Sequence, residues 1–125
     1  MKTAKDYMGE ANAVVGKVSP EEGIAIHAEG GATFIDVRDS ASIAQTGTVA
    51  GAQRLPRGLL EFAADPATPL FKDWLDFDAP YILVCGAGGQ AALAGKTMID
   101  MGYKNVRNGG GVPAWKDAGG PMEDG

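Results

Sequence analysis

A chain of 125 residues fits one compact domain and leaves no room for a second. Its hydrophobic content of 45% and charged content of 22% are ordinary for a globular protein, and its net charge of −5 argues against nucleic acid or an anionic membrane as a partner. A single cysteine excludes an internal disulfide, and with only one histidine besides it excludes a Cys/His metal site.

Targeting and membrane-spanning patterns are absent from the sequence. No apolar stretch approaches the roughly 20 residues that a membrane-spanning helix needs. The first six residues, Met-Lys-Thr-Ala-Lys-Asp, lack the apolar core of a secretory signal. We therefore expect a cytoplasmic protein.

Helical and extended patterns alternate along the first half of the chain. Residues 1–16 predict an N-terminal helix that begins with Thr3 and Asp6 as a capping pair. Lys17-Val18 predicts a short strand, and Ser19-Pro20 predicts the start of a helix that ends at Gly30-Gly31. The segments that follow are expected to be a buried strand at 33–37, a short helix at 41–44, a loop at 47–51 and a strand at 52–55.

The second half continues this alternation. The predicted elements are a short helix at 58–64, a helix at 69–77, a strand at 81–84, a helix ending at Met101, a strand at 105–107, a tight turn at 109–111, a helix at 112–118 and a tail at 119–125. Strands alternating with helices of about ten residues predict a mainly parallel sheet covered on both faces. Residues 1–125 are thus expected to form a single α/β domain.

Cys85 stands at the junction of three of these elements. It follows the apolar strand 81–84 and opens the glycine-rich segment 86–90, after which a helical pattern begins at once. Loop amides and a helix N-terminus can then favour the thiolate, which is the nucleophilic form of cysteine. No residue of the loop has a side chain large enough to bury the sulfur. We therefore expect Cys85 to be chemically functional, the alternative being a small buried hydrophobe.

Four segments of the chain carry a pattern that resembles a known family. They are residues 34–38 (Phe-Ile-Asp-Val-Arg), residues 56–62, residues 82–85 before the loop, and residues 101–115, which include three consecutive glycines. In this order they resemble the single-domain rhodanese-like family, sulfurtransferases of the thiosulfate sulfurtransferase type. The resemblance implies an α/β fold with a five-stranded, mainly parallel sheet flanked by helices on both faces. It also places the cysteine of the family's active loop at Cys85.

Further site residues follow from the loop and from this resemblance. The loop residues that would cradle the transferred sulfur are Gly86, Ala87, Gly88, Gly89 and Gln90. Arg57 follows a proline that ends a strand and is expected either to lend positive charge at the mouth of the site or to be a surface charge. The resemblance assigns Asp36 and Arg38 a supporting ion pair near the loop, the alternative being a solvated surface pair.

The sequence departs from the family pattern at two positions. The loop from Cys85 to Gln90 has the six-residue length of sulfurtransferases, but Gln90 stands where many members have arginine. Thr48 stands where the family often has histidine. The remaining histidine, His27, is expected to be an ordinary, partly exposed helix residue, so no histidine base is expected at the cysteine.

The resemblance implies a sulfurtransferase that moves sulfane sulfur through a Cys85 persulfide. The donor would be thiosulfate or a persulfide, and the acceptor a thiol, cyanide or a protein; no metal or organic cofactor is implied. A rival interpretation is a catalytically weak rhodanese-like binding or regulatory module, which the uncharged loop favours and the retained cysteine opposes. A phosphatase or arsenate reductase would need a seven-residue loop and an arginine, and the chain offers neither.

Overall fold

The computed structural model describes residues 1–125 and contains a five-stranded parallel sheet with strand order β1-β6-β5-β2-β4. A separate two-stranded antiparallel sheet joins β3 to β7. The strands of the main sheet are β1 (Gly16–Lys17), β2 (Thr33–Asp36), β4 (Gln53–Arg54), β5 (Pro80–Cys85) and β6 (Asn105–Gly111). The predicted α/β class and the five-stranded parallel sheet are confirmed.

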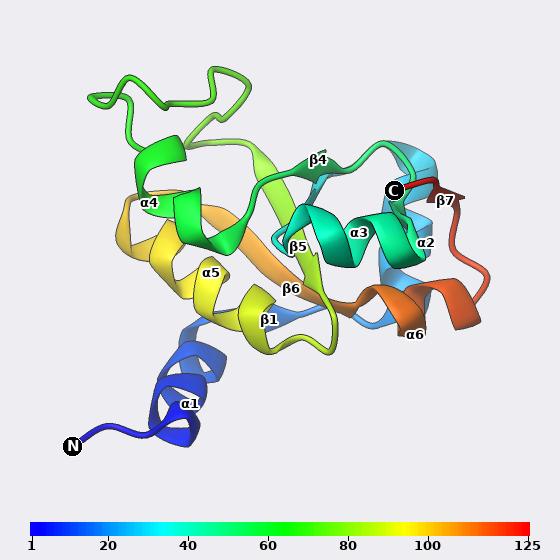
Figure 1. Ribbon diagram of the computed structural model, residues 1–125, viewed down its shortest axis with the longest axis horizontal. Helices are drawn as coiled ribbons and strands as arrows, with labels where there is room; N and C mark the ends of the chain where they lie inside the picture. Colours follow the sequence, from blue (N-terminus) through cyan, green and yellow to red (C-terminus); the bar gives the residue numbers. More distant parts are fainter.

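Helices cover both faces of this sheet (Figure 1). They are α1 (Ala4–Val14), α2 (Pro20–Glu29), α3 (Ser40–Thr46), the 3-10 turn η1 (Arg57–Leu59), α4 (Leu60–Ala63), α5 (Gly89–Asp100) and α6 (Val112–Asp117). Both predicted helix starts are confirmed, because Thr3 and Ser19 each form a complete capping box. Helix α1 buries Ala11, whereas its apolar side chains Tyr7 and Val14 are exposed.

Alternation along β5 divides the interior into two cores. Tyr81, Leu83 and Cys85 point toward α4 and α5 and belong to the larger buried cluster. Ile82 and Val84 point the other way, into a smaller cluster that contains Trp115 of α6. Because side chains alternate along a strand, a cysteine at this position faces α5 and not the core around Trp115.

The helix predicted at 69–77 is wrong. No helix or strand lies between Ala63 and Pro80; the chain there makes a series of turns. Asp65 and Asp76 each accept a hydrogen bond from a backbone N–H two residues later, which favours turns over helix. Of the apolar side chains that suggested a helix, Phe71, Trp74 and Leu75 instead pack in the larger core, and Leu70 is exposed.

The tight turn predicted at 109–111 is also wrong, because β6 runs through all three glycines to Gly111. Gly110 has a positive φ of 84°, whereas Gly109 and Gly111 are needed for close approach to neighbouring segments. A Cβ on Gly109 would come within 3.1 Å of Val84, and one on Gly111 would clash with the carbonyl of Gly86. Strand β6 can therefore lie directly against the start of the Cys85 loop.

Two short strands occupy segments that the sequence predicts as a loop and a tail. Strand β3 (Thr48–Val49) lies within the predicted loop 47–51, and β7 (Met122–Glu123) lies within the predicted tail. They pair with each other in antiparallel register. Two-residue strands carry too little periodicity to be recognised from sequence.

Candidate active site

Cys85 lies at the carboxyl end of β5, the central strand of the sheet, with 2% of its surface exposed. The helix α5 begins four residues later, so its N-terminus is directed back at the sulfur. The backbone N–H of Gly88 donates to Sγ at 3.0 Å, and that of Ala91 donates at 3.4 Å. Sγ is therefore held by two peptide donors, the arrangement that favours a thiolate.

A pocket of about 340 Å³ opens in front of this sulfur. Residues of the loop form one side of it, and residues that follow β2 form the other. The lining residues are Cys85, Gly86, Ala87, Gly89, Gln90, Arg38, Asp39 and Ser42. Gly88 is buried and does not line the pocket, but its N–H donates to Cys85 Sγ. The structure thus brings the sequence-predicted loop residues and Arg38 together in space.

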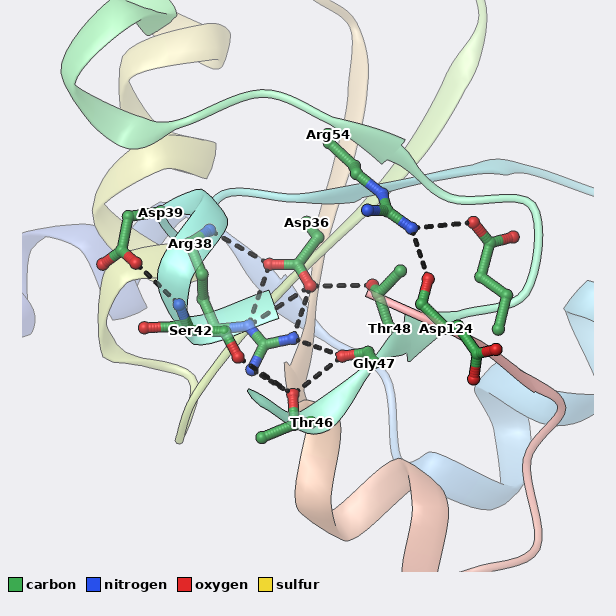
Figure 2. A network of polar contacts seen from close by, with 10 residues as sticks. Asp36, Arg38, Asp39, Ser42, Thr46, Gly47, Thr48, Arg54 and Asp124 are labelled. Atoms are coloured by element: carbon green, nitrogen blue, oxygen red, sulfur yellow. Dashed lines mark hydrogen bonds and ion pairs between the residues drawn. The ribbon is translucent and has the colours of Figure 1, made fainter. Parts of the chain in front are cut away.

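Asp36 and Arg38 form a buried ion pair, with Nη2 of Arg38 2.8 Å from Oδ2 of Asp36. Figure 2 shows the guanidinium enclosed by acceptors, since its other N–H groups donate to Thr46 Oγ1 and to the carbonyl of Gly47. Thr48 donates to the same carboxylate from β3. The alternative of a solvated surface pair is therefore wrong, because the two side chains are 0% and 8% exposed.

The pocket offers no unpaired cation to an anionic ligand. Arg38, the only basic residue in its lining, is neutralised by Asp36. Asp39 adds a carboxylate, whose pKa is lowered by the hydrogen bond from the backbone N–H of Ser42 at the start of α3. Positive potential at Cys85 must then come from peptide N–H groups and the N-terminus of α5.

Arg57 does not line this pocket. Its guanidinium donates to Glu61 at 2.9 Å and to Thr97 of α5 at 3.1 Å. It lies in an adjacent cavity of about 660 Å³ between α1 and α5, which shares only Gly89 with the Cys85 pocket. A role for Arg57 at the mouth of the Cys85 pocket therefore has no contact in the structure to support it.

His27 and Trp115 have structural partners elsewhere in the domain. His27 is half-buried, with Nε2 2.7 Å from the carbonyl oxygen of Ala50, and its ring packs edge-on against Phe34 and Trp115. Trp115 is 1% exposed, belongs to the smaller core and donates from Nε1 to the carbonyl of Pro121. Neither residue reaches the Cys85 pocket.

Sequence reasoning missed three residues around the loop: Asp39, Ser42 and Asn108. The first two follow the Asp36-Val37-Arg38 segment, and an N-cap pattern of Asp followed by Ser three residues later could have indicated them. Asn108 lies next to the glycines of β6 and donates from Nδ2 to the carbonyl of Gly88 at 3.0 Å. No signal in the sequence distinguishes it from a surface asparagine.

Comparisons with known proteins agree with the fold and the position of the loop. The sequence model of a protein family, the rhodanese-like domain, matches residues 19–118, which include every segment of the site described above. The chain belongs to the rhodanese-like family. Only α1, the edge strand β1 and the C-terminal strand β7 lie outside the matched residues of this rhodanese-like domain.

Named relatives of this rhodanese-like domain include sulfurtransferases. Thiosulfate sulfurtransferase GlpE of Pseudomonas entomophila is 30% identical over 102 residues, which cover 80% of this chain and 84% of that protein. The polysulfide-sulfur transferase homodimer of Wolinella succinogenes is 30% identical with a TM-score of 0.76, covering 97% of this chain and 87% of that one.

A further solved structure is more similar but has no established function. A protein of unknown function from Rhodopseudomonas palustris, described as a possible tyrosine phosphatase, is 36% identical with a TM-score of 0.93; the match covers 98% of this chain and 96% of that one. In the present rhodanese-like domain, no group of three or more His, Cys, Asp and Glu side chains could hold a metal ion, and no helix has the length and apolar character needed to cross a membrane.

Proposed function

We propose that this rhodanese-like domain is a sulfurtransferase in which Cys85 carries the transferred sulfur as a persulfide. The observation that supports this most directly is the pair of N–H donors, from Gly88 and Ala91, on a sulfur at the base of a pocket. The sulfurtransferase relatives support the same class of reaction. The thiol is also the only one in the chain, so no second cysteine can share the role.

The first step is attack by the Cys85 thiolate on the outer sulfur of a donor such as thiosulfate or a persulfide. An S–S bond forms to Sγ while the donor's own S–S bond breaks. The electron pair of the broken bond leaves with the remainder of the donor, as sulfite from thiosulfate or as a thiolate from a persulfide. The terminal sulfur of the Cys85 persulfide then lies among the N–H groups of the loop from Gly86 to Gln90, which stabilise its negative charge.

The second step returns the enzyme to its starting state. A nucleophilic acceptor, cyanide in an assay or a small-molecule or protein thiol, attacks the terminal sulfur. The bond between that sulfur and Sγ breaks, and its electron pair restores the Cys85 thiolate. Because donor and acceptor react in separate half-reactions through a covalent intermediate, we expect ping-pong kinetics.

A second candidate function is a catalytically weak binding or regulatory module. The absence of an unpaired cation in the pocket favours it, because such a site attracts an anionic donor poorly. The phosphatase alternative lacks support in the loop, which ends at Gln90 and contains no arginine.

Mass spectrometry of the intact protein after incubation with thiosulfate tests the proposal. We expect a mass gain of one sulfur atom, located at Cys85 and removed by cyanide with release of thiocyanate. The Cys85→Ser variant should fold normally and show neither the mass gain nor sulfur transfer. Transfer above background by that variant would exclude the covalent mechanism, and a wild-type protein that forms no persulfide with any donor would favour the binding module.

A further inference from the structure

The side chain of Asn108 connects strand β6 to the loop that holds Cys85. Its Nδ2 donates to the carbonyl oxygen of Gly88 at 3.0 Å, and its Oδ1 accepts from the backbone N–H of Gly110 at 2.8 Å. The residue is 5% exposed and is one of only four buried residues with polar or charged side chains. A buried amide that uses both ends in this way is fixed in a single orientation.

Gly88 is the residue through which this contact reaches the sulfur. It adopts a left-handed conformation with φ of 101°, and its own N–H donates to Cys85 Sγ at 3.0 Å. Its carbonyl also accepts from the N–H of Ala92, the first hydrogen bond of α5. The Gly88 carbonyl therefore accepts two hydrogen bonds, one from the first turn of α5 and one from the side chain of Asn108.

Fixing this carbonyl fixes the direction of the neighbouring donors. In a trans peptide the C=O and the N–H point in opposite directions, so the Gly88 carbonyl held toward β6 directs the Gly89 N–H away from that strand. Gly89 lines the pocket in front of the cysteine. The hydrogen bond from Asn108 also restrains the Gly88 N–H, which contacts Sγ. Only the φ and ψ angles of Gly88 separate the peptide plane that carries this N–H from the plane that carries the carbonyl.

We propose that Asn108 is a positioning residue of the Cys85 loop: its amide holds Gly88 so that the loop N–H groups are aligned on the thiolate and on the sulfur that it receives. Its side chain makes no hydrogen bond to Cys85 and does not line the pocket in front of the sulfur. The inference rests on the proposed function for its catalytic consequence. Its effect on the thiolate can be measured without sulfur transfer.

The test is the rate of alkylation of Cys85 by iodoacetamide as a function of pH, in the wild-type protein and in Asn108→Ala. The chain has one cysteine, so the alkylation reports on this thiol alone. We expect the profile of the variant to shift upward by about one pH unit, so that it reacts about tenfold more slowly at pH values well below both midpoints and at the wild-type rate at high pH. A loss of packing alone would not move the profile in this way. An unshifted profile in a folded Asn108→Ala protein would overturn the proposal.

Asn108→Leu is the second variant, since leucine is close to asparagine in size, adds no charge and removes both side-chain hydrogen bonds, to Gly88 and to Gly110. A shift like that of Asn108→Ala supports the positioning role, because the two variants share the lost hydrogen bonds and not a cavity. An unshifted profile in a folded Asn108→Leu protein contradicts it. Asn105→Leu, the same change at an exposed position of β6, should match the wild type.

Sulfur-transfer assays on the same proteins separate this inference from the proposed function. If the wild type transfers sulfur, Asn108→Ala should have a kcat/KM lower by about tenfold for any donor. If the wild type transfers none but the alkylation profile of Asn108→Ala shifts, the proposed function fails and the positioning role of Asn108 stands. If the wild type transfers sulfur and the profile does not shift, only the positioning role fails.

Discussion

Thr48 donates a hydrogen bond of 2.7 Å to the carboxylate of Asp36, and both side chains are completely buried. The carboxylate is held by Arg38 from one side and by Thr48 from the other (Figure 2). Arg38 lines the pocket in front of Cys85, so this bond reaches from β3 to the wall of the site. In this chain Thr48 therefore serves the buried ion pair of Asp36 and Arg38.

Thr48→Val should lower the free energy of unfolding by about 2 kcal/mol, the usual range for a hydrogen bond to a charged group being about 1.5–3 kcal/mol. Valine has nearly the same shape as threonine. The loss of stability therefore reports on the missing hydrogen bond and on the buried Asp36 carboxylate, which loses that donor. Urea denaturation measures the change. Thr46→Val is the control: its hydroxyl accepts from Arg38 at an exposed position, where water can replace it, and the cost should be smaller. Equal costs would show that burial of the Asp36 pair is unimportant.

Most of the helices and strands that position Cys85 can be predicted from the sequence. Short apolar runs predict strands β2 and β5, and capping patterns at Thr3 and Ser19 predict two helix starts, because both signals are local. The position of Cys85 between a strand and a helix followed from the same local patterns.

What the sequence could not supply depends on contacts between distant segments. Gly109, Gly110 and Gly111 predict a turn by their intrinsic preference, yet all three lie in strand β6. Gly109 lies too close to β5, and Gly111 too close to the Cys85 loop, for a side chain, whereas Gly110 has a positive φ of 84°. Asn108 acquires its partner Gly88 from 20 positions away in the chain. Such relationships become visible only once the strands are in register.

Gly111→Ala should destabilise the fold and disturb the Cys85 loop. The added Cβ would clash with the carbonyl of Gly86 and lie 3.1 Å from the Cα of Ala87, both of them backbone atoms that cannot rotate aside. Forced overpacking of this kind typically costs about 1–3 kcal/mol. Gly58→Ala is the matched control, since nothing lies within 4 Å of the new Cβ and no positive φ is involved. Thermal unfolding and Cys85 alkylation should both change in the first variant and neither in the second.

Alkaline pH should destabilise the protein through Tyr103. Burial raises the pKa of Tyr103 to about 12, and its hydroxyl donates to the carbonyl of Ala64 at 2.8 Å. The folded state thus holds the phenolic proton more tightly than the unfolded chain, whose tyrosine pKa is about 10. This contribution to stability is complete below about pH 10 and is lost as the pH rises toward 12.

Tyr103→Phe should therefore be less stable than the wild type at neutral pH and should lose stability less steeply above pH 10. Burial also raises the pKa of Tyr81, so some alkaline loss should remain. Denaturation curves recorded from pH 7 to 11 measure both effects, with the exposed Tyr7→Phe as the control. Parallel alkaline losses in wild type and Tyr103→Phe would contradict the assignment.

Asp39→Asn should increase the use of thiosulfate by a small factor, about twofold. Asparagine caps a helix as well as aspartate does, so α3 should remain intact while the pocket loses its unpaired carboxylate. The effect is small because the carboxylate is exposed and screened by solvent. Asp73→Asn is the control. Asp73 is exposed and lies in the turns that precede Pro80, the first residue of β5, whereas Cys85 is its last, so kcat/KM should stay unchanged. A similar gain from both variants would indicate only a general effect of net charge.

Gln90→Arg should raise kcat/KM for thiosulfate by about tenfold. Gln90 is exposed and lines the Cys85 pocket, where Arg38 is already paired with Asp36. Thiosulfate carries two negative charges, whereas glutamine offers only neutral hydrogen bonds; arginine would supply a full charge and a planar fork that matches the sulfonate oxygens. Tenfold corresponds to about 1.4 kcal/mol of added transition-state binding. The gain should be smaller for a neutral or singly charged persulfide donor, and Gln90→Glu should lower the thiosulfate value. An unchanged value in a folded Gln90→Arg protein would mean that the donor anion does not approach this side chain, and that surfaces outside the loop recognise the donor.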